Sequence, residues 1–179
     1  ITDWQDLADY ILPTSGRFFA SDVNKGSKVQ RGRKVYDSSA KRGLNVLSAG
    51  LMAGMTSPAR PWFRLSTGNA SLDKVHAVKV WLAEVAKLMR EVFAESNVYR
   101  SLHQLYTELG AFGTGAMVLL EDFENVLHCY SLTVGEYALA TDDKGKVNTL
   151  FREFNMTVGQ IVEQFGIDKC STAVKGHFE

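Results

Sequence analysis

A pair of prolines at the end of a predicted helix constrains this chain more than any other feature. Pro58 and Pro61 cannot continue a helix, because each lacks a backbone N–H group and its ring clashes with the preceding turn. The residues before them are pushed towards extended conformations. The segment 51–65, LMAGMTSPARPWFRL, therefore predicts a helix that ends at a structural hinge and continues as an extended aromatic segment.

The composition is that of a globular protein. Of the 179 residues, 45% are hydrophobic and 22% are charged, which is neither a disordered nor a fibrous profile. No apolar run approaches the roughly 20 residues that cross a bilayer, so we expect no membrane span. Cys129 and Cys170 lie far apart and outside any metal-binding spacing, which favours a reducing compartment. The chain starts at Ile1 rather than Met, which we interpret as a fragment or a processed product.

The charge is distributed unevenly along the chain. The formal net charge is zero, yet residues 1–64 carry 10 basic and 5 acidic side chains, whereas residues 65–179 carry 10 and 15. Most of the basic excess lies in residues 17–34, whose cations are Arg17, Lys25, Lys28, Arg31, Arg33 and Lys34. Such a segment can hold a phosphate backbone or a partner's acidic surface, and a solvated basic loop is the plainer alternative.

Hydrophobic periodicity predicts a helical first half. The expected helices cover residues 2–12, 38–55, 72–95 and 98–109. Pro13 ends the first helix, Asp37 or Ser38 caps the second, and Asn97 caps the fourth. We expect the third and fourth helices to meet at a sharp corner at Asn97. The tryptophan and methionine side chains on these helices are interpreted as core.

The second helix carries a face of small residues. Gly43, Gly50, Ala53 and Gly54 contribute to it, and a glycine inside a helix costs about 1 kcal/mol relative to alanine. We therefore expect a partner helix to pack closely there. After the hinge, residues 62–65 alternate as in a short strand.

Beyond Gly115 the pattern changes to short strands. We expect them over residues 116–120, 126–132, 137–140 and 147–154, with a hairpin or meander turn at residues 142–145. Thr157 and Gln160 have the spacing of a capping box before a last helix, for which Gly166 is a C-terminal cap. N-terminal helices, a small antiparallel sheet and a short final helix make the predicted fold class α+β.

No group of residues has a catalytic pattern. The glycines of residues 110–115 follow a helix and precede a strand, the reverse of a phosphate-binding cradle, so we assign them a turn and packing role. The acidic clusters 121–124 and 142–143 lack the spacing of a calcium loop and are interpreted as solvated turns. The four histidines are scattered, without a nucleophile at a recognisable spacing. We therefore predict no enzymatic activity, no cofactor and no metal site.

Arg60 and Arg64 flank the aromatic pair Trp62 and Phe63. This combination can stack on bases or on another subunit. Because no alternating basic and aromatic platform surrounds it, a protein contact or core anchoring is favoured over nucleic-acid readout.

A series of different short motifs extends along almost the whole chain. They are residues 4–8 and 10–13, residues 35–38, residues 44–65, the segment Glu-Ser-Asn-Val-Tyr-Arg at 95–100, and residues 135–137 with 142–145. Together they resemble the head-to-tail connector (portal) proteins of short-tailed bacteriophages. The resemblance implies an N-terminal, wing-like region of a longer chain. Its expected parts are an N-terminal helix and basic arm (1–36), a helical part (37–110), a β-rich part (111–156) and a final helix (157–179).

The same resemblance implies a structural role. Such proteins form a ring, usually a dodecamer, at one vertex of the phage head, through which double-stranded DNA is packaged and ejected. The implied partners are further copies of the chain, terminase, capsid and tail proteins and the passing DNA, with no membrane. ATP hydrolysis belongs to the terminase in such systems. The implied location is the portal vertex of the virion, and the host cytoplasm during assembly.

A ring requires a heterologous interface, in which one patch meets a different patch on the neighbour. Opposite charge on the two halves of the chain can set the register of that interface. We therefore predict that residues 17–34 reach an acidic surface of the adjacent subunit, with Arg60 and Arg64 as further subunit or DNA contacts. The competing hypothesis is a nucleic-acid-binding module that uses the same basic segment, and an enzyme ranks third.

Overall fold

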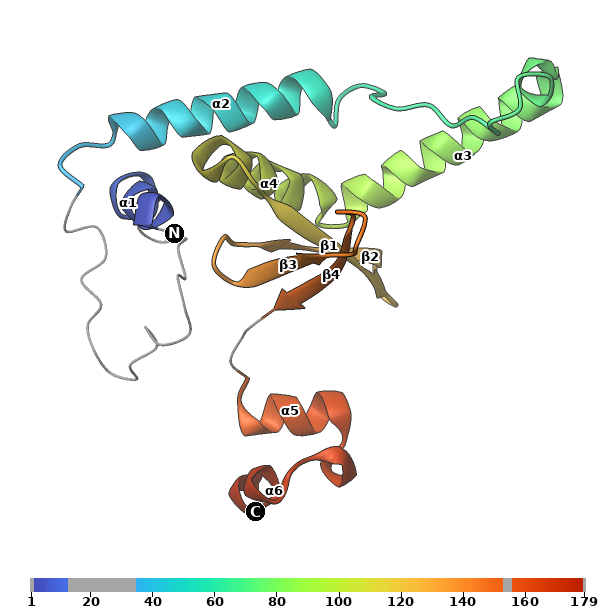
Figure 1. The fold of residues 1–179 in the computed structure, drawn as a ribbon. Helices are drawn as coiled ribbons and strands as arrows, with labels where there is room; N and C mark the ends of the chain where they lie inside the picture. The colour runs from blue at the N-terminus through green and yellow to red at the C-terminus, as the bar shows by residue number, and fades with distance from the viewer. Residues whose placement is uncertain (1, 13–34, 153–155, 179) are drawn as a thin grey trace. The chain divides into compact units, whose positions relative to one another are not determined.

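The computed structural model of the chain describes residues 2–12, 35–152 and 156–178. Its helices are α1 (Thr2–Ile11), α2 (Ser39–Met55), α3 (His76–Glu95), α4 (Val98–Phe112), α5 (Val158–Phe165) and α6 (Thr172–Phe178), with short 3-10 turns at Leu72–Lys74 and Ile167–Lys169. Its strands are β1 (Ala116–Asp122), β2 (Val126–Leu132), β3 (Tyr137–Thr141) and β4 (Val147–Arg152). The predicted α+β class is confirmed (Figure 1).

Contacts within the chain group it into two units, residues 1–135 and residues 136–179. The first unit holds α1 to α4 and an antiparallel hairpin of β1 and β2, in register from Ala116 opposite Leu132 to Asp122 opposite Val126. The second unit holds a separate antiparallel hairpin of β3 and β4, followed by α5 and α6. The expected strands therefore form two hairpins. Whether the chain is one wing-like region of a longer protein stays a prediction.

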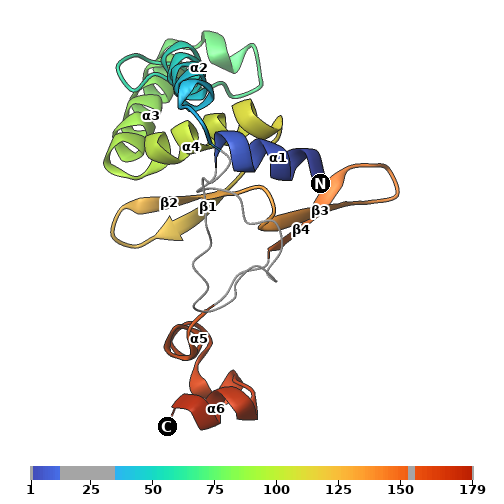
Figure 2. The same cartoon turned by 90° about the vertical axis from the view of Figure 1, so that its left-hand side faces the viewer.

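The core of the first unit lies where α1, α2 and α4 meet (Figure 2). Its buried side chains are Ala8, Leu12, Leu44, Phe112 and Val134, with Leu7, Ile11 and Ala111 packed against them. Fully burying a large aliphatic or aromatic side chain contributes about 1.5–3 kcal/mol. At the end of α2 the Thr56 and Tyr106 hydroxyls, both buried, share a hydrogen bond of 3.0 Å, which ties α2 to α4.

Close helix contact occurs at a different glycine from those predicted. A Cβ atom on Gly110 of α4 would lie 2.9 Å from Leu44 Cδ1 and 3.1 Å from Leu47 Cδ2 of α2. Around Gly43, Gly50 and Gly54, by contrast, the described part of the chain leaves open space. Within the described residues no helix of this chain packs on the small-residue face, and the partner helix expected there stays a prediction. Because the Leu44 side chain buries more apolar area than a glycine does, the side of α2 that carries Leu44 faces α4.

Three further local expectations need correction. Residues 62–65 are extended but belong to no strand among the described residues, because no neighbouring chain segment offers a hydrogen-bonding partner. The helix expected over residues 72–95 is interrupted at Val75, whose ψ of 126° is extended, and α3 starts only at His76. Trp81 and Met55, expected in the core, are 60% and 59% exposed.

The corner between α3 and α4 confirms the expected bend and corrects the role of Asn97. Asn97 occupies the N-cap position of α4, yet its side chain makes no cap hydrogen bond. Instead Oδ1 accepts from the backbone N–H of Cys129 at 2.7 Å, and Nδ2 donates to the Cys129 carbonyl at 2.7 Å. Ser101 of α4 donates to the same carbonyl at 3.1 Å. The corner therefore holds β2 through its outer edge.

The second unit follows its local sequence signals closely. In the turn between β3 and β4, Asp142 accepts from the backbone N–H groups of Lys144 and Lys146. The capping box is confirmed, since Thr157 Oγ1 accepts from Gln160 N and Gln160 Oε1 accepts from Thr157 N. At the end of α5, the N–H of Gly166 donates to the Val162 carbonyl at 2.9 Å, which confirms the expected cap.

Candidate functional site

Six of the eight predicted contact residues lie outside the described residues. They are Arg17, Lys25, Lys28, Arg31, Arg33 and Lys34. Their assignment to a subunit or DNA contact stays a prediction. The other two, Arg60 and Arg64, lie on the extended segment between α2 and α3 and have different surroundings.

The Arg60 guanidinium binds carbonyl groups at the C-terminal end of α2. Its guanidinium donates from Nη2 to the Ala53 carbonyl at 2.7 Å and lies 3.4 Å from the Gly54 carbonyl. The last carbonyls of a helix have no intrahelical partner and carry partial negative charge, so a cation stabilises them. Arg60 thereby fixes the direction in which the extended segment leaves the helix.

The aromatic pair anchors the extended segment on α3, which confirms core anchoring as its role within the chain. The Trp62 and Phe63 rings lie 4.8 Å apart, edge to face, and their centroids are 6.3 Å and 5.9 Å from that of Phe93. Trp62 Nε1 donates to the Tyr99 hydroxyl at 3.3 Å. Because both rings are half-buried against the chain's own helix, they form no free stacking platform for bases.

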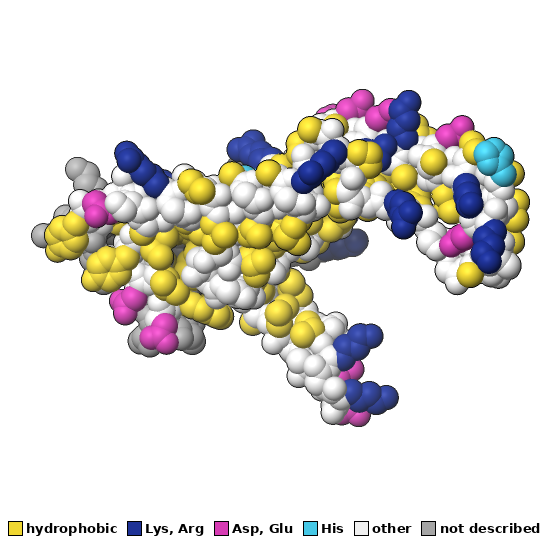
Figure 3. Space-filling view, turned by 90° about the horizontal axis from the view of Figure 1, so that it is seen from above, with side chains coloured by type: hydrophobic (Ala, Val, Ile, Leu, Met, Phe, Trp, Pro, Cys, Tyr) yellow, Lys and Arg dark blue, Asp and Glu magenta, His cyan; other side chains and the backbone are white. Residues whose placement is uncertain are grey.

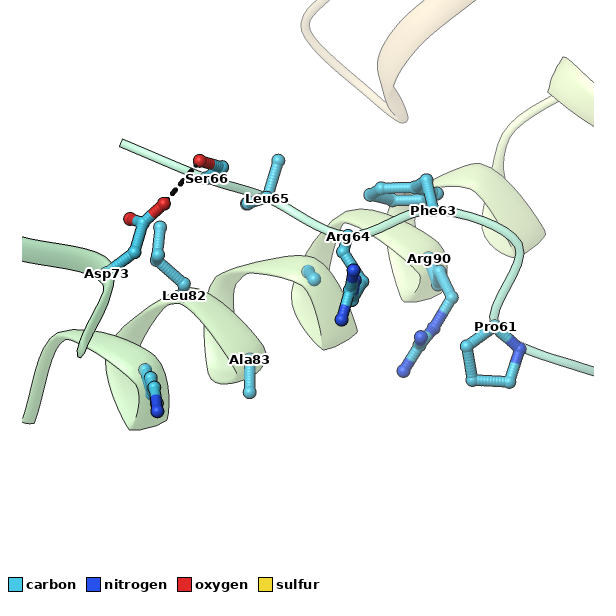
Figure 4. Close-up of a pocket in the computed structure, with 11 residues that line it drawn as sticks. Pro61, Phe63, Arg64, Leu65, Ser66, Asp73, Leu82, Ala83 and Arg90 are labelled. Carbon is cyan, nitrogen blue, oxygen red and sulfur yellow. Dashed lines mark hydrogen bonds between the residues drawn. The ribbon is translucent and has the colours of Figure 1, made fainter. Parts of the chain in front are cut away.

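Between this segment and α3 lies a groove of about 680 Å³ (Figure 4). We call it the basic groove. Its lining is formed by Pro61, Phe63, Arg64, Leu65 and Ser66 of the segment, by Asp73, and by Lys79, Leu82, Ala83, Ala86 and Arg90 on and beside α3. The Arg64 and Arg90 side chains point to the same side, away from the extended segment (Figure 4). The lining is mainly apolar, and its cations extend from the segment and from α3.

The groove carries a net positive charge. Within the described residues, Arg64, Lys79 and Arg90 have no ion-pair partner. The one carboxylate of the lining, Asp73, is occupied: it accepts from the Ser66 hydroxyl, from the Thr67 hydroxyl at 2.6 Å and from the Thr67 N–H at 3.0 Å. These hydrogen bonds hold the pKa of Asp73 below its ordinary value, and the bond from Ser66 has the largest effect. An anion is therefore the ligand that suits this groove.

The turn between β1 and β2 has the opposite character. We call residues 121–125 the acidic tip. Phe123 is 96% exposed, and Glu121 and Glu124 are exposed beside it. Asp122 accepts from the Glu124 N–H at 2.9 Å, and this bond is the main reason that its pKa lies below its ordinary value. The expectation of a solvated turn is confirmed.

The residue directly after the acidic tip has a strained backbone. Val126 has a φ of 68°, the left-handed region that β-branched side chains avoid. Its neighbour Leu127 donates from N–H to the Asn125 carbonyl at 2.7 Å, across Val126. Strain of this kind costs about 1–3 kcal/mol and persists only where the surrounding structure enforces it. The tip is therefore a fixed turn.

The glycine-rich residues 110–115 have the turn and packing role that their order predicts. Gly113 caps α4 with a φ of 72°, and its N–H donates to the Leu109 carbonyl at 3.0 Å. No phosphate cradle forms there. In the described ranges no three His, Cys, Asp or Glu side chains come together as metal ligands. None of the described helices has both the length and the apolar character needed to cross a membrane.

The helices of the first unit also present uncharged surface. Val46 and Leu47 on α2 are 73% and 48% exposed beside the open glycines, and Trp81 and Leu88 on α3 are both 60% exposed. Viewed from above, α2 shows backbone and hydrophobic atoms between a few cations (Figure 3). These exposed apolar side chains are available for contacts with another protein.

Sequence reasoning missed Lys79, Arg90 and Phe123. A usable signal existed for the cations: they are eleven residues apart on one helix, about three turns, so they share a face. Arg64 lies near Lys79 and Arg90 only because the extended segment runs along α3. Phe123 had no signal, because a phenylalanine in a polar turn can equally fold back onto the sheet.

Comparison with known proteins places the chain in a class of viral structural proteins. The family model described as bacteriophage head to tail connecting protein matches residues 1–179. The chain belongs to this family, which confirms the resemblance drawn from its motifs.

Two curated relatives carry portal names. The probable portal protein of Bordetella phage BPP-1 is 54% identical over 179 residues, which are 100% of this chain and 32% of that protein. The portal protein of Salmonella phage epsilon15 is 45% identical over 176 residues, 98% of this chain and 31% of that protein. The chain thus spans about a third of the length of these relatives.

Proposed function

We propose that this chain is part of a structural subunit of a phage portal ring, through which double-stranded DNA is packaged and ejected. The observation that carries the proposal is the identity of 54% to a probable portal protein, which extends over the whole chain. The anion-suited groove and the exposed apolar side chains on α2 and α3 support a role in contacts with other macromolecules. We assign no catalytic step, cofactor or metal to the chain.

The proposed partners are further copies of the chain in a ring, a dodecamer, together with terminase, capsid and tail proteins and the passing DNA. The proposed place is the portal vertex of the virion, reached from the host cytoplasm during assembly. Negative-stain electron microscopy and sedimentation of the full-length protein test the ring. A protein that stays single at high concentration contradicts the proposal.

Within that ring, we propose that residues 17–34 meet an acidic surface of the adjacent subunit. The support is the charge of the segment, whose six cations accompany one acid. Replacing Arg31, Arg33 and Lys34 by Glu in the full-length protein is expected to weaken ring assembly and to reduce its sensitivity to salt. Unchanged assembly with unchanged salt sensitivity excludes this contact.

The same basic segment supports the second candidate, a nucleic-acid-binding module. That function requires binding of duplex DNA whose affinity falls steeply with salt, because each neutralised phosphate releases counterions. Filter binding at a low and a high salt concentration separates the candidates. Strong, steeply salt-dependent binding together with the absence of rings favours the module.

A further inference from the structure

We propose that the acidic tip of one subunit inserts into the basic groove of the next, and that this pair is a head-to-tail contact of the ring in addition to the one proposed for residues 17–34. The inference rests on the proposed function and names the two surfaces through which it works. A closed ring needs two different, complementary patches on every subunit. The first unit presents one patch of each kind.

The charges of the two patches match. The basic groove offers Arg64, Lys79 and Arg90, which have no ion-pair partner within the described residues, and its one carboxylate is already held by Ser66 and Thr67. The acidic tip offers two exposed glutamates, Glu121 and Glu124, for which no partner is found in the same part of the chain. Complementary potentials of this kind steer association and fix register.

The apolar parts match as well. Phe123 stands between the two glutamates and is 96% exposed, although it gains nothing from water contact. The lining of the basic groove is mainly apolar and includes Phe63, Leu82 and Ala86. The groove volume of about 680 Å³ lies within the range of about 300–1,000 Å³ that admits ligands of this size. An aromatic side chain that is buried in a pocket near the centre of an interface is a common form of interface hot spot.

The acidic tip is also held in advance of binding. Asp122 closes the turn through the Glu124 N–H, and Val126 is kept at a positive φ. A turn that is fixed before it docks loses little conformational entropy on association.

Charge reversal tests the pairing in the full-length protein. The tip variant carries Glu121→Lys and Glu124→Lys, and the groove variant carries Lys79→Glu and Arg90→Glu. Asp122 is left unchanged because it holds the turn. Each variant alone is expected to lose rings, because its tip and groove then have the same sign. An equimolar mixture is expected to regain rings of alternating subunits, since each tip then meets a groove of opposite charge.

The mixture separates the proposal from misfolding, because a misfolded variant is not rescued by another. Matched controls reverse charges outside both patches: Asp143→Lys with Glu163→Lys, and Lys144→Glu with Lys169→Glu, all at exposed positions. The controls are expected to form rings as the wild type does. Phe123→Ala, which removes an exposed side chain and leaves the fold intact, is expected to weaken association about 30-fold.

The outcomes are distinct. If the wild-type protein forms no rings, the proposed function itself fails. If the wild type forms rings and both charge variants also form them, the proposed function stands and this contact is wrong. Failure of the mixture to assemble overturns it as well. Intact rings with a loss of duplex DNA binding in the groove variant alone assign the groove to phosphate and also overturn the proposal.

Discussion

Removal of the Asn97 side chain tests how the helix corner supports the first hairpin. The Asn97 amide makes two hydrogen bonds of 2.7 Å to the backbone of Cys129, which is 2% exposed. A two-stranded hairpin is marginal by itself, so β1 and β2 depend on such anchoring. Asn97→Ala leaves the Cys129 N–H without a partner, whereas the Cys129 carbonyl keeps Ser101.

The magnitude follows from these contacts. A buried donor left unsatisfied costs about 1–3 kcal/mol, and the second lost bond contributes about 0.5–1.5 kcal/mol. The free energy of opening β2 is therefore expected to fall by about 1.5–4.5 kcal/mol, which accelerates amide exchange about 10-fold to 1,500-fold. Hydrogen–deuterium exchange of residues 126–132 in the full-length protein measures this change directly.

Asn45→Ala is the matched control. Asn45 is exposed on α2, and no hydrogen bond of its side chain is found among the described residues. Its replacement is expected to leave exchange in residues 126–132 unchanged, because alanine suits a helix and no contact to β2 is lost. If Asn97→Ala exchanges at the wild-type rate in the same segment, the corner does not hold the strand and the reasoning is refuted.

The remaining predictions concern packing, pH and the thiols. Gly110→Val is expected to destabilise the protein by about 1–3 kcal/mol, because the larger side chain overpacks against α2. Gly50→Ala, which lies in open space, is expected to stabilise the protein by up to about 1 kcal/mol. Urea unfolding of both variants measures the difference, and equal effects on stability contradict the packing described for α2. The lowered pKa of Asp73 means that its bonds to residues 66 and 67 stabilise the fold above its ordinary pKa of 3.8 and are lost as the pH falls through the lower folded value. The protection of the amides of residues 66–74, measured relative to the intrinsic exchange rate at each pH, is therefore expected to fall below about pH 4 in the wild type. In Asp73→Asn this protection is expected to be low already at neutral pH and to change little further; an identical pH profile of protection in both proteins rules this out. Burial raises the pKa of the Cys129 thiol, so a thiol reagent is expected to modify Cys170 first in the native protein, and mass spectrometry that finds equal labelling contradicts the burial of Cys129.

Features that depend on residues close in sequence could be predicted. The capping box at Thr157 and the C-terminal cap at Gly166 were predictable, because each depends on backbone and side-chain groups a few residues apart. The hairpin turns were predictable for the same reason. The break at Val75 was missed because its periodic apolar residues also suit a longer helix.

The candidate site was less predictable. The charge and the aromatic pair near the proline hinge identified one wall of the basic groove through Arg64. The other wall depends on how the extended segment lies along α3, and this is decided by the packing of Trp62 and Phe63 on Phe93. Such packing joins residues about thirty positions apart, so no local pattern reveals it.

The sequence by itself determined the α+β class, most of the helices and hairpins, the absence of a recognisable catalytic pattern and the resemblance to connector proteins. These follow from periodicity, turn chemistry and motif order, all of which are written along the chain. Only the tertiary structure decided that Asn97 binds β2 rather than capping its helix, that Gly110 rather than Gly50 receives the neighbouring helix, and that Phe123 faces water. Each of these features depends on which contacts between distant parts of the chain are the most stable, and those contacts exist only in the packed structure.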